Sequence, residues 1–245
     1  MLLALFLIDL VAGLVLFLPL VGRRNAGVKF YRLIFITSGT LALCACAAHF
    51  LARRSDLAIA DAIAAALTLL VYVVLRYPKR VIFKASAALM GIAYAVAAIL
   101  AYQAAVQPSH VAWSIAGALA SVALLGSINL AMLLGHWYLV VRGMAIDPLK
   151  RLTIATLAAT LVRIAVVIAA FLAIDRTSLR AETLFFLMRA GWGLLGPLLL
   201  YPMVWGTVKI RSTMAATGIL YVDVVAVIIG EVLAGWLATI AHVPL

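Results

Sequence analysis

The stretch Thr183–Lys209 reads TLFFLMRAGWGLLGPLLLYPMVWGTVK, an apolar run of membrane length that contains Arg189, Pro197 and Pro202. A guanidinium group in hydrocarbon costs at least about 2.5 to 3.5 kcal/mol, so Arg189 needs a partner, water or a ligand. Each proline removes a backbone donor and leaves a carbonyl group that only protein or a wet cavity can satisfy. The stretch therefore predicts an integral membrane protein with a polar interior.

Composition extends this prediction to the whole chain. Of its 245 residues, 68% are hydrophobic and 11% are charged, whereas soluble domains are about half apolar and a quarter charged. A net charge of +11 would suggest nucleic acid in a soluble protein, but the chain has no soluble basic domain. We expect a lipid bilayer, and no nucleic acid, as its partner. Cys44 and Cys46 lie two residues apart in an apolar run, so we expect free thiols.

Apolar runs of about 20 residues recur along the sequence and are separated by short charged or Pro/Gly segments. They cover residues 2–21, 33–52, 57–75, 81–102, 111–141, 152–174, 183–204 and 214–240. The first run has no basic segment before it, so we interpret it as a retained span rather than a signal peptide. The sequence predicts one all-α domain, residues 1–245, a polytopic membrane bundle of about eight helices.

Orientation follows from the positive charges of the loops. Loops after the even-numbered runs hold only Arg53, Arg54, Arg176 and Arg180, and most of the 19 Lys and Arg residues follow the odd-numbered runs. The positive-inside rule then places both termini outside, in a bacterial or archaeal cytoplasmic membrane. The run 111–141 would form a helix of about 46 Å, so we expect it to tilt or to project from the bilayer.

Charged residues inside the runs are expected to pair across helices. Counting from the run boundaries places Arg163 and Asp223 at similar depth near the midplane, and it matches Arg189 with Glu231 in the same way. We predict the ion pairs Arg163–Asp223 and Arg189–Glu231. Such pairs either carry function or only neutralise each other and fix the register of the helices.

A second polar cluster is predicted in the outer third, where Asp9, His49 and Asp61 fall on the first three runs. The loop between the second and third runs is short, so His49 and Asp61 are expected to touch. A carboxylate that accepts one ring N–H would orient the other nitrogen toward a haem iron, a metal or a quinone oxygen. The alternative is a histidine bonded to a backbone carbonyl. His136 lies near the opposite interface.

Glycines in the run 183–204 spell GxGxxG at Gly191, Gly193 and Gly196, but no strand precedes them, so a dinucleotide site is excluded. Close helix packing or a break in the helix explains them better. Ala226 and Gly230 form a small-xxx-small pair that suits such packing or the seam of a homodimer.

Two functions fit these patterns, and a third is structural. The first is a membrane redox protein that binds b-type haem, quinone or both and transfers electrons to a redox partner. His49 and His136 are its candidate metal ligands, but their depths are too different for one haem. The other candidate cofactor-binding residues, which would contact propionates, quinone oxygens or protons, are Asp61, Arg163, Arg189, Asp223 and Glu231.

The second function is a solute or proton-coupled transporter, with a helix interrupted between residues 193 and 202 and with Arg189 binding an anion. The third is an anchoring subunit of a larger membrane complex. All three need a polar core, which we expect from the first, second, third, sixth, seventh and eighth runs.

Overall fold

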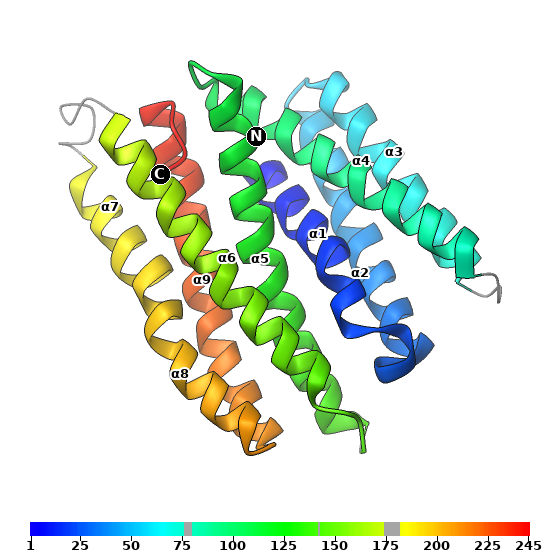
Figure 1. The fold of residues 1–245 in the computed structure, drawn as a ribbon. Coiled ribbons are helices and arrows are strands. Elements are labelled where there is room, and N and C mark those ends of the chain that lie inside the picture. Colours follow the sequence, from blue (N-terminus) through cyan, green and yellow to red (C-terminus); the bar gives the residue numbers. More distant parts are fainter. Residues whose placement is uncertain (76–79, 142, 174–181) are drawn as a thin grey trace.

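Helices follow the apolar runs throughout the part of the chain that the computed structural model describes, residues 1–75, 80–141, 143–173 and 182–245. The elements are α1 Leu2–Val21, α2 Arg23–Leu51, α3 Ser55–Val74, α4 Arg80–Val106, α5 Val111–Val140, α6 Asp147–Ala173, α7 Thr183–Met188, the π-helix η2 Arg189–Leu195, α8 Gly196–Lys209 and α9 Thr213–Ala241 (Figure 1). Elements α7, η2 and α8 form one continuous span, so the described residues contain eight helices able to cross a membrane. The predicted all-α polytopic membrane bundle is confirmed. Arg176 and Arg180 of the topology argument, and residue 174 of the sixth run, lie outside the described residues.

Several helices extend into the charged segments that separate the apolar runs. Helix α2 begins at Arg23, ten residues before the predicted start, and it bends at Gly27, where φ is 77°. Glycine adopts this conformation without the penalty that a Cβ would bring. Helix α6 begins at Asp147 with Pro148 in its first turn, where the missing N–H costs nothing. Hydropathy therefore locates every span but underestimates the length of several of them, whereas the bounds of α1 are those predicted.

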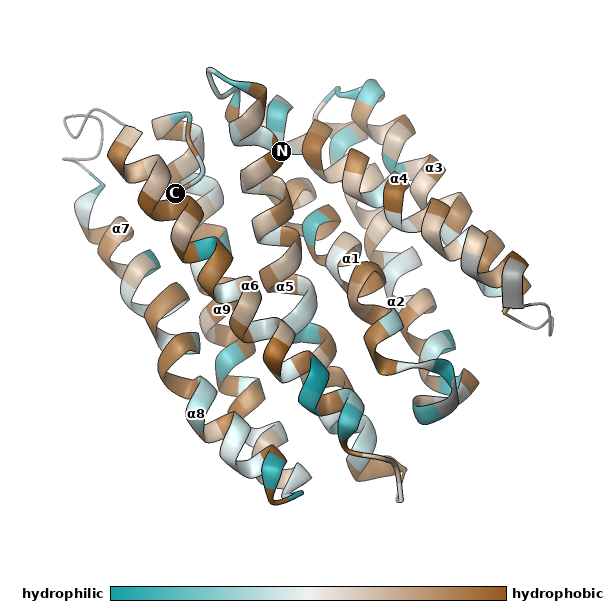
Figure 2. Cartoon of the chain, viewed as in Figure 1, coloured by the Kyte–Doolittle hydropathy of each residue, from teal (hydrophilic) through white to brown (hydrophobic). Residues whose placement is uncertain are grey.

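Hydrophobic residues cover most of the length of the helices, and hydrophilic residues gather toward the helix ends (Figure 2). Many large apolar side chains point outward, as expected of a surface in contact with lipid. Both ends of the chain lie at the same end of the bundle (Figure 1), which agrees with an even number of spans. We call this the terminal end and the opposite end the distal end.

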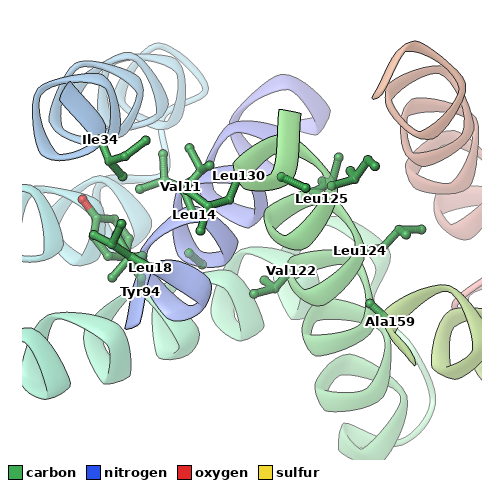
Figure 3. Packing of buried hydrophobic residues seen from close by; sticks show 14 of the residues in the cluster. Val11, Leu14, Leu18, Ile34, Tyr94, Val122, Leu124, Leu125, Leu130 and Ala159 are labelled. Atoms are coloured by element: carbon green, nitrogen blue, oxygen red, sulfur yellow. The ribbon is translucent and has the colours of Figure 1, made fainter. Parts of the chain in front are cut away.

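Helix α5 is the centre of the bundle and contacts α1, α4, α6 and α9. Of an 18-residue apolar stretch of α5, 78% is buried, a larger share than in any other described span. Leu14 of α1 and Val122 and Leu130 of α5 share one buried cluster (Figure 3). Helices α1 and α5 approach very closely at Gly13, where an added Cβ would lie 2.4 Å from the Cα of Gly126. The long fifth helix is therefore the central packing element of the bundle, which hydropathy alone did not indicate.

The orientation of the bundle is tested by cysteine labelling in a background with Cys44 and Cys46 replaced by alanine. Asn25 and Ser109 are both exposed. Asn25 lies in the first turn of α2 at the distal end, and Ser109 lies between α4 and α5 at the terminal end. In right-side-out cells, Asn25→Cys is expected to react with an impermeant maleimide only after permeabilisation, because the positive-inside rule places this turn in the cytoplasm. Ser109→Cys is expected to react in intact cells. The reverse pattern would overturn the orientation.

Candidate functional site

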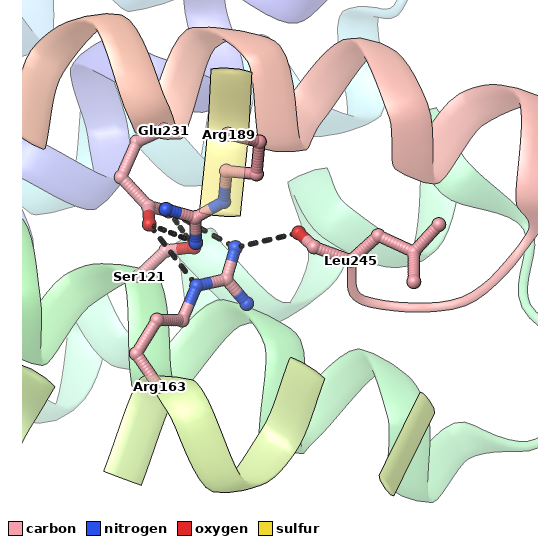
Figure 4. A network of polar contacts seen from close by, with 5 residues as sticks. All are labelled: Ser121, Arg163, Arg189, Glu231 and Leu245. Carbon is pink, nitrogen blue, oxygen red and sulfur yellow. Dashed lines mark hydrogen bonds and ion pairs between the residues drawn. The ribbon is translucent and has the colours of Figure 1, made fainter. Parts of the chain in front are cut away.

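Glu231 of α9 lies at the centre of a buried ion cluster (Figure 4). Arg163 of α6 donates from Nε to Oε1 and from Nη2 to Oε2, each at 3.0 Å, and Arg189 of η2 donates from Nη2 to Oε1 at 2.7 Å. Ser121 of α5 donates its hydroxyl to Oε2 at 2.7 Å. Arg163 also donates to the Leu245 carbonyl at 3.4 Å. One carboxylate therefore joins four helical elements inside the bundle.

The predicted pair Arg189–Glu231 is confirmed, whereas the predicted pair Arg163–Asp223 is wrong. Because α6 begins at Asp147 rather than at residue 152, Arg163 lies about 24 Å from the distal end of α6 instead of about 16 Å. Along α9, Asp223 lies about 15 Å and Glu231 about 27 Å from the distal end of the helix. The depth of Arg163 therefore matches that of Glu231 better than that of Asp223. An error of five residues in one helix start therefore changed the partner of Arg163.

The cluster contains two guanidinium groups and one carboxylate. A further acid, Asp9 of α1, lies close to it. Asp9 is 3% exposed and lines the same cavity as Arg163 and Glu231. The expectation that Asp9 joins His49 and Asp61 is therefore wrong, because its face of α1 is turned toward α5 and α9. Its Oδ1 has no hydrogen-bond partner among the described residues.

Small residues let the seventh span approach α9. A Cβ added at Gly193 would lie 2.5 Å from the Cα of Gly230, and one added at Gly196 would lie 3.7 Å from the Cβ of Ala226. The predicted packing role is confirmed within the monomer for Gly193, Gly196, Ala226 and Gly230, whereas a Cβ added at Gly191 would meet nothing within 4 Å in the described part of the chain. The predicted break between 193 and 202 is wrong, because the span continues through the π-helix that begins at Arg189. A π-helix shifts the helix register, and here it starts at the buried arginine.

A cavity of about 390 Å³ adjoins the ion cluster. Its polar lining residues are Asp9, Tyr102, Ser121, Arg163 and Glu231, and its apolar lining includes Leu2, Leu5, Phe6, Leu125 and Trp236. The Tyr102 hydroxyl and Arg163 Nη1 are buried without a partner among the described residues. The cavity thus has an apolar wall and a polar end with unused hydrogen-bonding groups.

The cluster and the adjoining cavity include residues from helices that were not expected in the polar core. Ser121 and Tyr102 come from α5 and α4, the fifth and fourth spans. The sequence offered no signal for them beyond a hydroxyl within an apolar run, because their role depends on which helices become neighbours.

His49 and Asp61 form a second buried pair, between α2 and α3. His49 Nδ1 lies 2.8 Å from Asp61 Oδ2, as predicted, and Nε2 has no partner among the described residues. His136 is exposed, and its Nδ1 lies 3.5 Å from the Tyr221 hydroxyl. Across the described ranges, no three His, Cys, Asp or Glu side chains gather as a metal site.

The fold and the site define a polytopic α-helical membrane protein with a buried ion cluster beside a cavity. A search with the chain matches no protein-family model, no curated protein and no solved structure.

Neutralising Glu231 tests the energetic role of the cluster. Glu231→Gln leaves two buried guanidinium groups without a counter-charge, so we expect a loss of about 3 to 5 kcal/mol in unfolding free energy. Thermal unfolding of the detergent-purified protein measures this loss. The control Asp56→Asn breaks the exposed Arg54–Asp56 pair and is expected to change stability little. Equal effects of the two variants would contradict the prediction.

Gly230→Ala tests the close approach of η2 and α9. The added methyl group would lie 2.4 Å from the Cα of Gly193 and 3.1 Å from Arg189 Nη1, so we expect a lower melting temperature. Gly218→Ala on the same helix is the matched control, because nothing lies within 4 Å of its Cβ position. That control should gain up to about 1 kcal/mol from helix propensity. A Gly230→Ala protein as stable as Gly218→Ala would exclude the tight contact.

Proposed function

We propose that the protein binds a membrane-soluble quinone, with the quinone ring at the polar end of the cavity beside Arg163. The observation that carries this proposal is a set of unpaired hydrogen-bonding atoms at the buried end of a largely apolar cavity. The cavity volume of about 390 Å³ falls in the range of about 300 to 1,000 Å³ typical of small-molecule sites.

Access from the bilayer supports a lipid-soluble ligand. Leu3, Val232 and Trp236 line the cavity and are 64%, 53% and 48% exposed. They belong to α1 and α9 within the predicted membrane thickness, so the cavity opens between these helices toward lipid. An apolar molecule with a polar head group enters such a site without crossing water.

The polar end suits both redox states of a quinone. Arg163 Nη1 and the Tyr102 hydroxyl are donors without partners, and a quinone carbonyl oxygen accepts hydrogen bonds from such groups. Asp9 Oδ1 is an oxygen without a partner, which accepts the hydroxyl proton that a hydroquinone donates. An unpaired buried polar group is costly, so a ligand that satisfies these three residues gains binding free energy.

Arg189, in contrast, lines neither this cavity nor the smaller one between α6, α8 and α9. Its role in the proposal is to hold Glu231, and with it Arg163, in place. His49 and His136 line neither cavity, so b-type haem at these histidines stays a separate prediction from the sequence.

Transport is the second candidate, and one specific observation favours it. Thr153, Thr156, Thr160 and Arg163 form a buried polar row on α6 that runs from the distal half of the bundle to the ion cluster. Such a row beside midplane charges is typical of the interior of a secondary transporter.

Tryptophan quenching by a short-chain quinone tests the proposed site in detergent or nanodiscs. We expect saturable quenching that Trp236→Phe largely removes, because Trp236 lines the cavity. Tyr102→Phe is expected to weaken binding about 3- to 10-fold through the loss of one hydrogen bond. The matched control Tyr94→Phe should bind normally, because Tyr94 pairs with Thr68 elsewhere in the bundle.

Two results would overturn this proposal. Quenching that persists in Trp236→Phe would place the quinone elsewhere. Equal competition by an alkyl chain that carries no carbonyl group would show an acyl-chain groove instead of a quinone site.

A further inference from the structure

A second, smaller cavity lies between α6, α8 and α9 in the distal half of the bundle. Its volume of about 10 Å³ is that of a single water-sized species. Its polar lining residues are Thr153, Thr156, Thr160, Tyr201 and Asp223. This cavity is distinct from the proposed quinone site, with which it shares no lining residue.

Among the described residues, Asp223 is the only acid that lines this small cavity. Its side chain is 3% exposed, and its Oδ1 has no hydrogen-bond partner in the described part of the chain. None of the ion pairs formed by the described residues includes Asp223. A buried carboxylate without a counter-charge is very costly, so it must take up a proton or hold a cation.

The threonine hydroxyls favour a bound cation over a proton on Asp223. Each one donates its proton to the backbone carbonyl four residues earlier: Thr153 to Leu149 at 2.9 Å, Thr156 to Leu152 at 3.0 Å and Thr160 to Thr156 at 2.9 Å. The hydroxyl oxygens then present only lone pairs to the cavity. A protonated carboxyl group donates one hydrogen bond and satisfies one of these oxygens, whereas a cation is stabilised by all of them.

Carboxylate and hydroxyl oxygens are among the ligands that hard cations prefer, and Asp223 and the three threonines supply both kinds to this cavity. A single carboxylate balances one positive charge, and the water-sized space suits a small ion.

We propose that Asp223, Thr153, Thr156 and Thr160 form a binding site for Na⁺ between α6, α8 and α9. The site is independent of quinone binding, because it lies on the distal side of the ion cluster and uses other residues. It neutralises the one acid of α9 that the arginines leave unpaired.

Thermal unfolding with Na⁺, and with N-methyl-D-glucamine at equal ionic strength, tests this site in the full-length purified protein. At a Na⁺ concentration of one hundred times the Kd, we expect a rise in melting temperature of about 5 to 10 °C over the organic cation. Asp223→Asn keeps the shape of the side chain and removes its charge. This variant should show no Na⁺ response, and it should be at least as stable as the wild type without Na⁺.

The hydroxyl contribution is tested with a matched pair of threonines. Thr156→Val is expected to raise the Na⁺ concentration at half effect about 3- to 10-fold. Thr207→Val should leave it unchanged, because Thr207 is half-buried on α8, donates to Met203 and Val204, and does not line the cavity.

Three outcomes would overturn the proposal. The first is an equal melting temperature in Na⁺ and in the organic cation, and the second is a Na⁺ response that survives Asp223→Asn. The third is a wild-type stability that varies with pH and not with Na⁺, which would show that the carboxyl group holds a proton. Binding of radioactive ²²Na⁺ to the wild type and to Asp223→Asn gives an independent reading of the same question.

Discussion

The rest of the structure depends on the attraction between one carboxylate and two guanidinium groups in a medium that screens charge poorly. Each of these three ions alone would strongly oppose burial in the bundle, and together they hold α6, η2 and α9 at one level. Ser121 adds α5 through a hydroxyl bond to the same carboxylate. The cluster thereby fixes the relative heights of helices whose apolar surfaces would otherwise allow sliding.

Close backbone packing makes this electrostatic arrangement sterically feasible. The π-helix and Gly193 bring the seventh span against Gly230, which leaves the guanidinium of Arg189 directly beside both glycines. On the other side of the bundle, Gly13 and Gly126 hold α1 against α5, and α1 carries Asp9. Small residues thus determine which polar groups share a cavity, although they form no polar contact themselves.

Much of the fold was predictable because the bilayer imposes a simple rule on helix length and composition. The eight spans follow from hydropathy, the His49–Asp61 contact from the short loop between two runs, and the Arg189–Glu231 pair from depth. The depth argument gave the wrong partner for Arg163, because polar residues at the start of α6 extend the helix beyond its apolar run. The sequence could not predict the shared site of Asp9, Tyr102 and Ser121 for another reason. Their shared cavity depends on the order of helices around α5, which one sequence does not encode as a local pattern.

The position of Glu231 in the chain also affects how the protein enters the membrane. Both arginines precede their carboxylate in the sequence, and α9 is the last span that the structure describes. During synthesis, Arg163 and Arg189 are therefore made before the residue that neutralises them. Stable insertion of the sixth and seventh spans has to wait for α9, or it has to rely on Asp9, water or the insertion machinery in the interval. A chain that ends before α9 therefore carries two guanidinium groups in its spans without the carboxylate that pairs with both.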